Sequence, residues 1–157
     1  MFDDILKIKM HKEERALRYV ETCRHKLAAA EQALVDGQKT LEDYKVFRRE
    51  EKVRLFQEVQ NEQVSMQKVD EMNRNIAKLK EQELAHIKRL EELRQALAQA
   101  QSDLEASQVA HHQAQLDVQK YREIKSVVDE DRRKEAEVRE ELELEDVARP
   151  GGGVSPF

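Results

Sequence analysis

The apolar residues of this chain recur at alternating intervals of three and four residues along two long stretches. In the first stretch, two series with seven-residue spacing carry Val20, Leu27, Leu34 and Leu41 and, as companions, Cys23, Ala30, Gly37 and Tyr44. The second stretch repeats this spacing at Val69, Ile76, Glu83, Leu90, Leu97, Leu104, His111 and Val118, with companions Met72, Leu79, His86, Leu93, Ala100, Ser107, Ala114 and Tyr121. Such spacing places one narrow apolar stripe along a helix and is typical of a coiled coil.

One part of the second stretch departs from the apolar pattern. Glu83 and His86 occupy the seven-residue series there, while two apolar residues, Leu84 and Ile87, stand beside it. We interpret this departure as a stutter, at which the buried stripe shifts onto Leu84 and Ile87.

Glycine and proline are absent from Gln38 to Arg149, so no strong helix breaker separates the two stretches. The same region is rich in Ala, Leu, Glu, Gln, Lys and Arg, which lose little side-chain freedom in a helix. The chain therefore forms either one very long helix or two helices joined by a turn with subtler signals.

The best signal for such a turn lies between Asn61 and Ser65. Asn61 tolerates the left-handed conformation that ends a helix, and Ser65 is a good N-cap. Val64 and Val69 stand on either side of this cap at the positions of a hydrophobic staple. A break at residues 70–75 would give arms of more equal length, but it lacks the staple.

We therefore predict an all-α fold, a long antiparallel two-helix coiled-coil hairpin with a tight turn near residues 61–65. Helix one is expected at about 4–60 and helix two at about 66–146, within a single domain over 1–147 and before a flexible tail at 148–157. The end of helix two, residues 122–147, has no partner within the chain.

Opposed residues in this hairpin have numbers that add to about 126, because the two helices run antiparallel from the turn. The expected apolar pairs are Leu41 with Leu84, Leu34 with Leu90 and Leu93, Leu27 with Leu97, Val20 with Leu104, Leu17 with Val109, Met10 with Leu116, and Phe56 with the Val69–Met72 turn of helix.

The composition excludes several classes of protein. Charged residues make up 39% of the chain and aromatic residues 4%, which is too few large apolar side chains for an ordinary globular core. The periodicity argues against disorder, the other class with this composition. Acidic and basic residues are well mixed, so no broad basic face is expected to bind nucleic acid. The exception is residues 129–146, with ten acids and four bases, either a solvated helix end or a docking tail for a basic partner.

No stretch is apolar enough to span or insert into a membrane, and the N-terminus lacks the apolar core of a signal peptide. The single cysteine, Cys23, cannot form an internal disulfide and suits a reducing cytoplasm. A two-helix seam offers no deep pocket, and His111 and His112 are adjacent and so diverge on a helix. We therefore predict no catalytic residue, no metal site and no cofactor, and hence no enzyme.

The aromatic residues point to a contact surface. Three of the seven, Tyr44, Phe47 and Phe56, lie within 13 residues of helix one, near the predicted turn. A two-helix seam cannot bury every such side chain, so part of this set is expected to be exposed for a partner. The alternative, that these rings only pack in and beside the seam, stays open.

A set of short segments occurs in an order and at spacings that resemble a known family. They are Leu6-x-x-Lys9, Glu14-Arg15-Ala16, Asp43-Tyr44-x-x-Phe47-Arg48, Arg54-Leu55-Phe56, Ile76-Ala77-x-Leu79-Lys80-Glu81-x-Glu83 and Lys120-Tyr121-x-Glu123-Ile124, followed by an acidic end. Over residues 1–145 the chain resembles the YscO/FliJ-type stalk proteins of bacterial type III secretion, and within them the YscO branch of the virulence injectisome.

This resemblance implies a non-enzymatic stalk at the cytoplasmic base of the secretion apparatus, a monomer in isolation. It would link the hexameric export ATPase to the export gate and bind chaperones of secreted translocators. On this basis we expect Tyr44, Phe47, Arg48 and Phe56 to contact the gate or a chaperone. We expect Lys7, Lys9, Lys12, Arg15 and Lys120, at the helix ends, to enter the ATPase ring. Two alternatives are a dedicated secretion chaperone and a coiled-coil scaffold or adaptor that forms homodimers.

Overall fold

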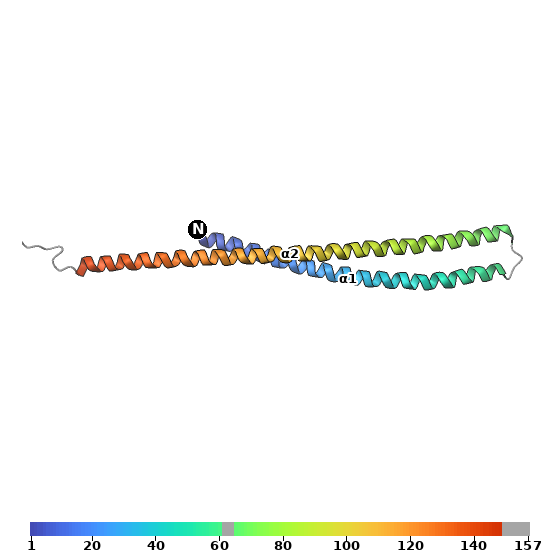
Figure 1. The fold of residues 1–157 in the computed structure, drawn as a ribbon, viewed down its shortest axis with the longest axis horizontal. Helices are drawn as coiled ribbons and strands as arrows, with labels where there is room; N and C mark the ends of the chain where they lie inside the picture. The colour runs from blue at the N-terminus through green and yellow to red at the C-terminus, as the bar shows by residue number, and fades with distance from the viewer. Residues whose placement is uncertain (61–64, 149–157) are drawn as a thin grey trace, which may run out of the picture. The chain divides into compact units, whose positions relative to one another are not determined.

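The computed structural model describes residues 1–60 and 65–148, and two long helices account for nearly all of them. Helix α1 spans Phe2–Gln60 and helix α2 spans Met66–Ala148 (Figure 1). These bounds differ by at most two residues from the expected 4–60 and 66–146. The two-helix hairpin predicted from the apolar spacing is confirmed, because paired residues of α1 and α2 lie side by side in antiparallel order.

Ser65 begins α2 as its N-cap. Its Oγ accepts a hydrogen bond from the backbone N–H of Lys68 at 3.4 Å, and its carbonyl oxygen accepts from Lys68 and Val69. These bonds satisfy backbone donors of the first turn, as predicted for a serine at this position. The predicted roles of Asn61 and Val64 fall outside the described residues, as does the expected tail from residue 149 on.

The chain divides into two compact units, each built from both helices. The turn unit comprises Tyr19–Gln108, and the terminal unit comprises Met1–Arg18 together with Val109–Phe157. Within each unit, a segment of α1 and a segment of α2 run side by side in opposite directions (Figure 1). That residues 1–147 form a single domain stays a prediction.

In the turn unit, the buried residues fall on the predicted seven-residue series. They are Val20, Cys23, Leu41 and Leu55 of α1 and Leu79, Leu90 and Ser107 of α2. The helices approach closely at Gly37, where an added Cβ would lie 2.6 Å from Cδ1 of Leu93. A regular coiled-coil seam therefore runs through this unit.

The predicted stutter is wrong. Leu84 and Ile87 are exposed, by 65% and 44%, while Glu83 and His86 keep the seam positions and are half-buried. The expected Leu41–Leu84 pair is therefore also wrong. The physical reason is that two side chains of α1 lie across the seam there: Arg48 pairs with Glu83, and the ring of Tyr44 packs against His86.

The predicted pairing of Phe56 with the Val69–Met72 turn of helix is also wrong. Phe56 is exposed, whereas the adjacent Leu55 is buried and lines a shallow groove with Met72. Leu55 follows Leu41 by 14 residues and so keeps the seam series. Because successive helical residues differ by about 100° in direction, Phe56 points away from the seam.

Among the described residues of the terminal unit, Ala114 and Val118 are buried, and three polar pairs join α1 to α2. The pairs are Asp3 with Lys125, Lys9 with Asp117 at 3.8 Å, and Glu13 with His111 at 3.0 Å. Their residue numbers add to 128, 126 and 124, close to the predicted value.

Two expected apolar pairs of the terminal unit do not fill its seam. Met10, Leu17, Val109 and Leu116 are all exposed. The seam positions beside them are held by Glu13 and His111, which are half-buried and hydrogen-bonded to each other. Met10 and Leu116 nevertheless line one shallow groove, in agreement with their predicted pairing, although neither fills the seam, because a polar pair occupies this part of it.

Candidate partner-binding surfaces

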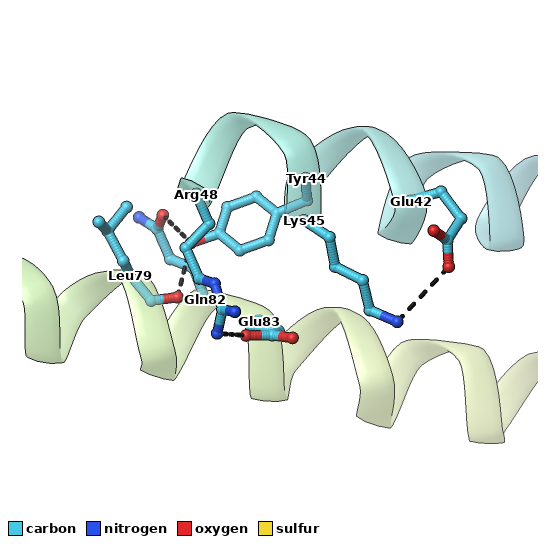
Figure 2. Close-up of polar contacts among 7 residues, drawn as sticks. All are labelled: Glu42, Tyr44, Lys45, Arg48, Leu79, Gln82 and Glu83. Carbon is cyan, nitrogen blue, oxygen red and sulfur yellow. Dashed lines mark hydrogen bonds and ion pairs between the residues drawn. The ribbon is translucent and has the colours of Figure 1, made fainter. Parts of the chain in front are cut away.

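Tyr44 lies at a seam position of the turn unit, where it crosses to α2 (Figure 2). Its hydroxyl donates a hydrogen bond to the Leu79 carbonyl oxygen at 2.6 Å and lies 3.1 Å from Oε1 of Gln82. Its ring centroid is 4.7 Å from that of His86. Burial, helped by the negative charge of Glu83, raises the pKa of Tyr44, so the phenol remains a neutral donor.

Arg48 lies one turn beyond Tyr44 and forms an ion pair with Glu83 across the seam (Figure 2). The side chains of Arg48 and Glu83 are 34% and 16% exposed. The pair explains how a glutamate occupies a position that elsewhere carries leucine. A sequence signal for it exists: Arg48 follows Leu41 by seven residues, and Glu83 follows Ile76 by seven. Arg48 and Glu83, which carry opposite charges, thus both lie on the seven-residue series of the seam.

The four aromatic and basic residues predicted to contact the export gate or a chaperone do not form one cluster. Phe47 is 49% exposed, and its ring centroid lies 6.0 Å from that of Tyr44. Phe56 is 43% exposed, but it follows Phe47 by nine residues, about two and a half helical turns. The two phenylalanines therefore lie on opposite flanks of α1. Tyr44 and Arg48 are engaged with α2, so Phe47 is the exposed member of this neighbourhood.

The five predicted basic contact residues all belong to the terminal unit. Four of them have exposed side chains: Lys7, Lys12, Arg15 and Lys120. Lys9 differs, because its Nζ lies 3.8 Å from Asp117 and 5.3 Å from the ring centroid of Tyr121. Lys9 is therefore half-buried in the seam, where its charge is already paired.

Within residues 1–60 and 65–148, no group of three or more His, Cys, Asp or Glu side chains could hold a metal ion. Neither described helix contains an apolar stretch long enough to cross a membrane. The described residues present helix surfaces for contact with other molecules: exposed aromatic rings, charged flanks and the seam.

Two comparisons with known proteins point to the same family. A family model described as type III secretion protein YscO matches residues 2–150. Among solved structures, the chain is similar to the type III secretion protein YscO from Vibrio parahaemolyticus, seen in a crystal structure at 2.8 Å. The two sequences are 25% identical and the structures superpose with a TM-score of 0.88, covering 93% of this chain and 92% of that one. No curated protein matches the chain.

Proposed function

The chain belongs to the YscO family of type III secretion proteins, and on this premise we propose that it is a non-enzymatic central stalk of the secretion apparatus. In this role it links the hexameric export ATPase to the export gate at the cytoplasmic base of the apparatus. The observation that carries the proposal is the family match over nearly the whole chain, together with two helices that continue without interruption through both units.

The proposed mechanism is allosteric coupling by an asymmetric element. One two-helix chain presents a different surface in each direction, so the six subunits of a hexameric ring meet different side chains. Contacts that differ between subunits bias their nucleotide states differently, because a ligand shifts an equilibrium only through its differential affinity. The stalk supplies no reacting group in this scheme.

The terminal unit is the proposed ATPase-binding part. Lys7, Lys12, Arg15 and Lys120 are exposed there and are free to meet acidic groups of a ring. Lys9 has a structural role in this proposal, because its ammonium group is held by Asp117 and Tyr121. The turn unit is the proposed contact for the gate or for translocator chaperones, with Phe47 and Phe56 as exposed rings on its two flanks and Tyr44 and Arg48 orienting the Phe47 side.

Co-purification with the cognate export ATPase and stimulation of its ATP hydrolysis test this function. We expect the wild-type chain to bind and stimulate, and the variant Lys7→Glu/Lys12→Glu/Arg15→Glu/Lys120→Glu to lose both effects. The matched control is Lys26→Glu/Lys39→Glu/Lys78→Glu/Lys88→Glu, which makes the same charge change at exposed bases of the turn unit.

The outcomes separate the stalk from the other candidate functions. Equal loss in both quadruple variants would show that only net charge matters and would contradict the assigned surface. Absence of ATPase binding by the wild-type chain, combined with direct binding of secreted cargo, would support a dedicated chaperone. A stable dimer in sedimentation equilibrium would support a scaffold.

A further inference from the structure

The first 18 residues of α1 are held against α2 by little buried apolar surface. None of the residues of Met1–Arg18, all of which the structure describes, is buried. The part of α1 in the turn unit, in contrast, carries the buried seam residues Val20, Cys23, Leu41 and Leu55. Segments with few buried apolar side chains open locally at a lower free energy than the rest of a fold. We name residues 1–18 the arm.

The middle of the arm faces α2 with polar or small side chains. Its seam positions there are Lys9, Glu13 and Ala16, which lie on the seven-residue series. Lys9 pairs with Asp117 and Glu13 with His111, and these four side chains are between 16% and 37% exposed. Ion pairs that water can reach contribute little to stability, because solvent screens their charges. The middle of the arm therefore adds little to its attachment.

The larger apolar side chains of the arm lie near its beginning. Phe2 and Leu6 occupy seam positions and are half-buried, as is Ile5 between them. Asp3 adds an ion pair with Lys125 of α2. Residues 2–6 therefore provide most of the apolar contact that attaches the arm.

This distribution makes detachment of the arm cooperative. Once residues 2–6 leave α2, only the two polar pairs and the small side chain of Ala16 hold the rest of the arm, up to the buried Val20. Ordinary fraying differs, because it loosens a helix progressively from its end and leaves the middle attached.

We propose that the arm is a releasable strap, which detaches from α2 as one piece while the turn unit stays paired. Its release uncovers the seam face of α2 in the terminal unit, where Ala114 and Val118 are buried in the closed form. The strap thus alternately covers and exposes an apolar surface. This inference does not rest on the proposed stalk function, because it concerns the chain by itself.

Double electron–electron resonance between two spin labels measures the release in the full chain. The labels are attached to pairs of cysteines in a Cys23→Ala background, at exposed positions of α1 and α2 whose numbers add to 127. Positions within each helix differ by multiples of seven, so all pairs have the same orientation relative to the seam. The terminal pairs are Asp4→Cys/Glu123→Cys and His11→Cys/Leu116→Cys, and the matched control in the turn unit is Lys39→Cys/Lys88→Cys.

We expect both terminal pairs to show a second population at longer distance, on the order of a few per cent, and the turn pair to show none. The two terminal pairs should show equal fractions, because the arm leaves as one piece. A larger fraction at residues 4 and 123 than at residues 11 and 116 would indicate fraying and would overturn the proposal. A longer distance in the turn pair would indicate opening of the turn unit as well, and would also overturn it.

Substitutions in the arm then test what holds it. Leu6→Gln is expected to raise the released fraction about fivefold at both terminal pairs, because a half-buried apolar side chain is lost from the seam. The matched control, Ile8→Gln, changes a side chain that is 62% exposed and should leave the fraction unchanged. Equal effects of these two substitutions, or no effect of Leu6→Gln, would contradict the proposal.

A further variant tests the polar middle of the arm. Adding Lys9→Leu/Glu13→Leu/His111→Leu to Leu6→Gln makes this part of the seam apolar and should return the released fraction to the wild-type level or below it. An undiminished fraction would show that the polar seam is not the reason for release, and would overturn the proposal. Far-UV circular dichroism checks that every variant keeps the helicity of the wild-type chain.

Discussion

The ion pair between Arg48 and Glu83 allows a quantitative test of how this seam tolerates charge. The perturbation is Arg48→Met, which keeps a long, helix-favouring side chain but removes the cation facing Glu83. The Glu83 carboxylate then stays mostly covered, since its side chain is 16% exposed in the pair. It also loses the charged partner with which it is paired across the seam.

The expected magnitude follows from the burial of the pair. Removing one partner from a fully buried ion pair costs roughly 3–5 kcal/mol, whereas exposed pairs contribute about 0–1 kcal/mol. Arg48 is 34% exposed, so water screens this pair to an intermediate degree. We expect Arg48→Met to lower the free energy of unfolding by about 1–2 kcal/mol.

The double replacement Arg48→Met/Glu83→Leu is expected to behave differently. It restores an apolar layer, so its free energy of unfolding should equal or exceed that of the wild-type chain, since apolar replacements of buried pairs are often neutral or stabilising. Urea unfolding followed by far-UV circular dichroism, completed with Glu83→Leu alone, gives the coupling energy of the pair. The reasoning is refuted if Arg48→Met costs less than about 0.3 kcal/mol, or if the double variant is as unstable as Arg48→Met.

Three further predictions use other contacts. At the close approach of the helices, Gly37→Ala should change the free energy of unfolding by less than about 1 kcal/mol, because the better helix propensity of alanine offsets the displacement of the end of the Leu93 side chain. Gly37→Leu should lower the free energy of unfolding by about 1–3 kcal/mol, because the larger side chain overpacks the seam. A Gly37→Leu variant as stable as the wild-type chain in urea unfolding would contradict this. The hydrogen bond and charge of Lys125 lower the pKa of Asp3, so the pair stabilises the fold above the ordinary aspartate pKa and this contribution is lost as the pH falls through the folded value. Lys125→Met should therefore raise the pKa of Asp3 in an NMR titration, whereas an unchanged titration would show that the pair does not persist in solution. Phe47→Ala should abolish secretion while leaving helicity intact, and normal secretion would remove Phe47 from the proposed contact.

The helices and their seam positions followed from the sequence because their causes are local. The seven-residue series needs only the period of a helix, and every seam position it assigned from Val69 to Tyr121 is buried or half-buried. The N-cap at Ser65 likewise depends on backbone groups within one turn. Neither inference required knowledge of what lies across the seam.

Errors arose where hydrophobicity and periodicity disagreed. At Leu84 and Ile87 the sequence interpretation followed hydrophobicity, but the helix kept its period and placed Glu83 and His86, half-buried, in the seam instead. The outcome depends on the partner side chains, here Tyr44 and Arg48, and the partner depends on the register of two segments far apart in the chain. The candidate site suffered from a similar difficulty. Periodicity alone could predict which residues face solvent. It could not predict whether Arg48 is free or paired.

The polar pairs in the seam also explain how the chain selects one register. A seam of leucine and alanine repeats every seven residues, so a slip of α2 along α1 by one heptad would still bury apolar side chains. For Arg48 and Glu83 such a slip is costly. It would place Ile76 or Leu90 opposite Arg48, and Leu41 or Leu55 opposite Glu83.

The same holds for Glu13 and His111 in the terminal unit. A one-heptad slip would set Leu104 or Val118 against Glu13, and Leu6 or Val20 against His111. Either slip therefore leaves half-buried polar groups facing apolar side chains in both units, with a penalty at each group of at most about 1–3 kcal/mol, the cost for a fully buried one. We infer that these polar pairs act against alternative registers rather than for stability in general. The polar residues at which hydrophobicity gave the wrong interpretation thus fix the register of the two helices. The register in turn determines where the exposed contact residues lie.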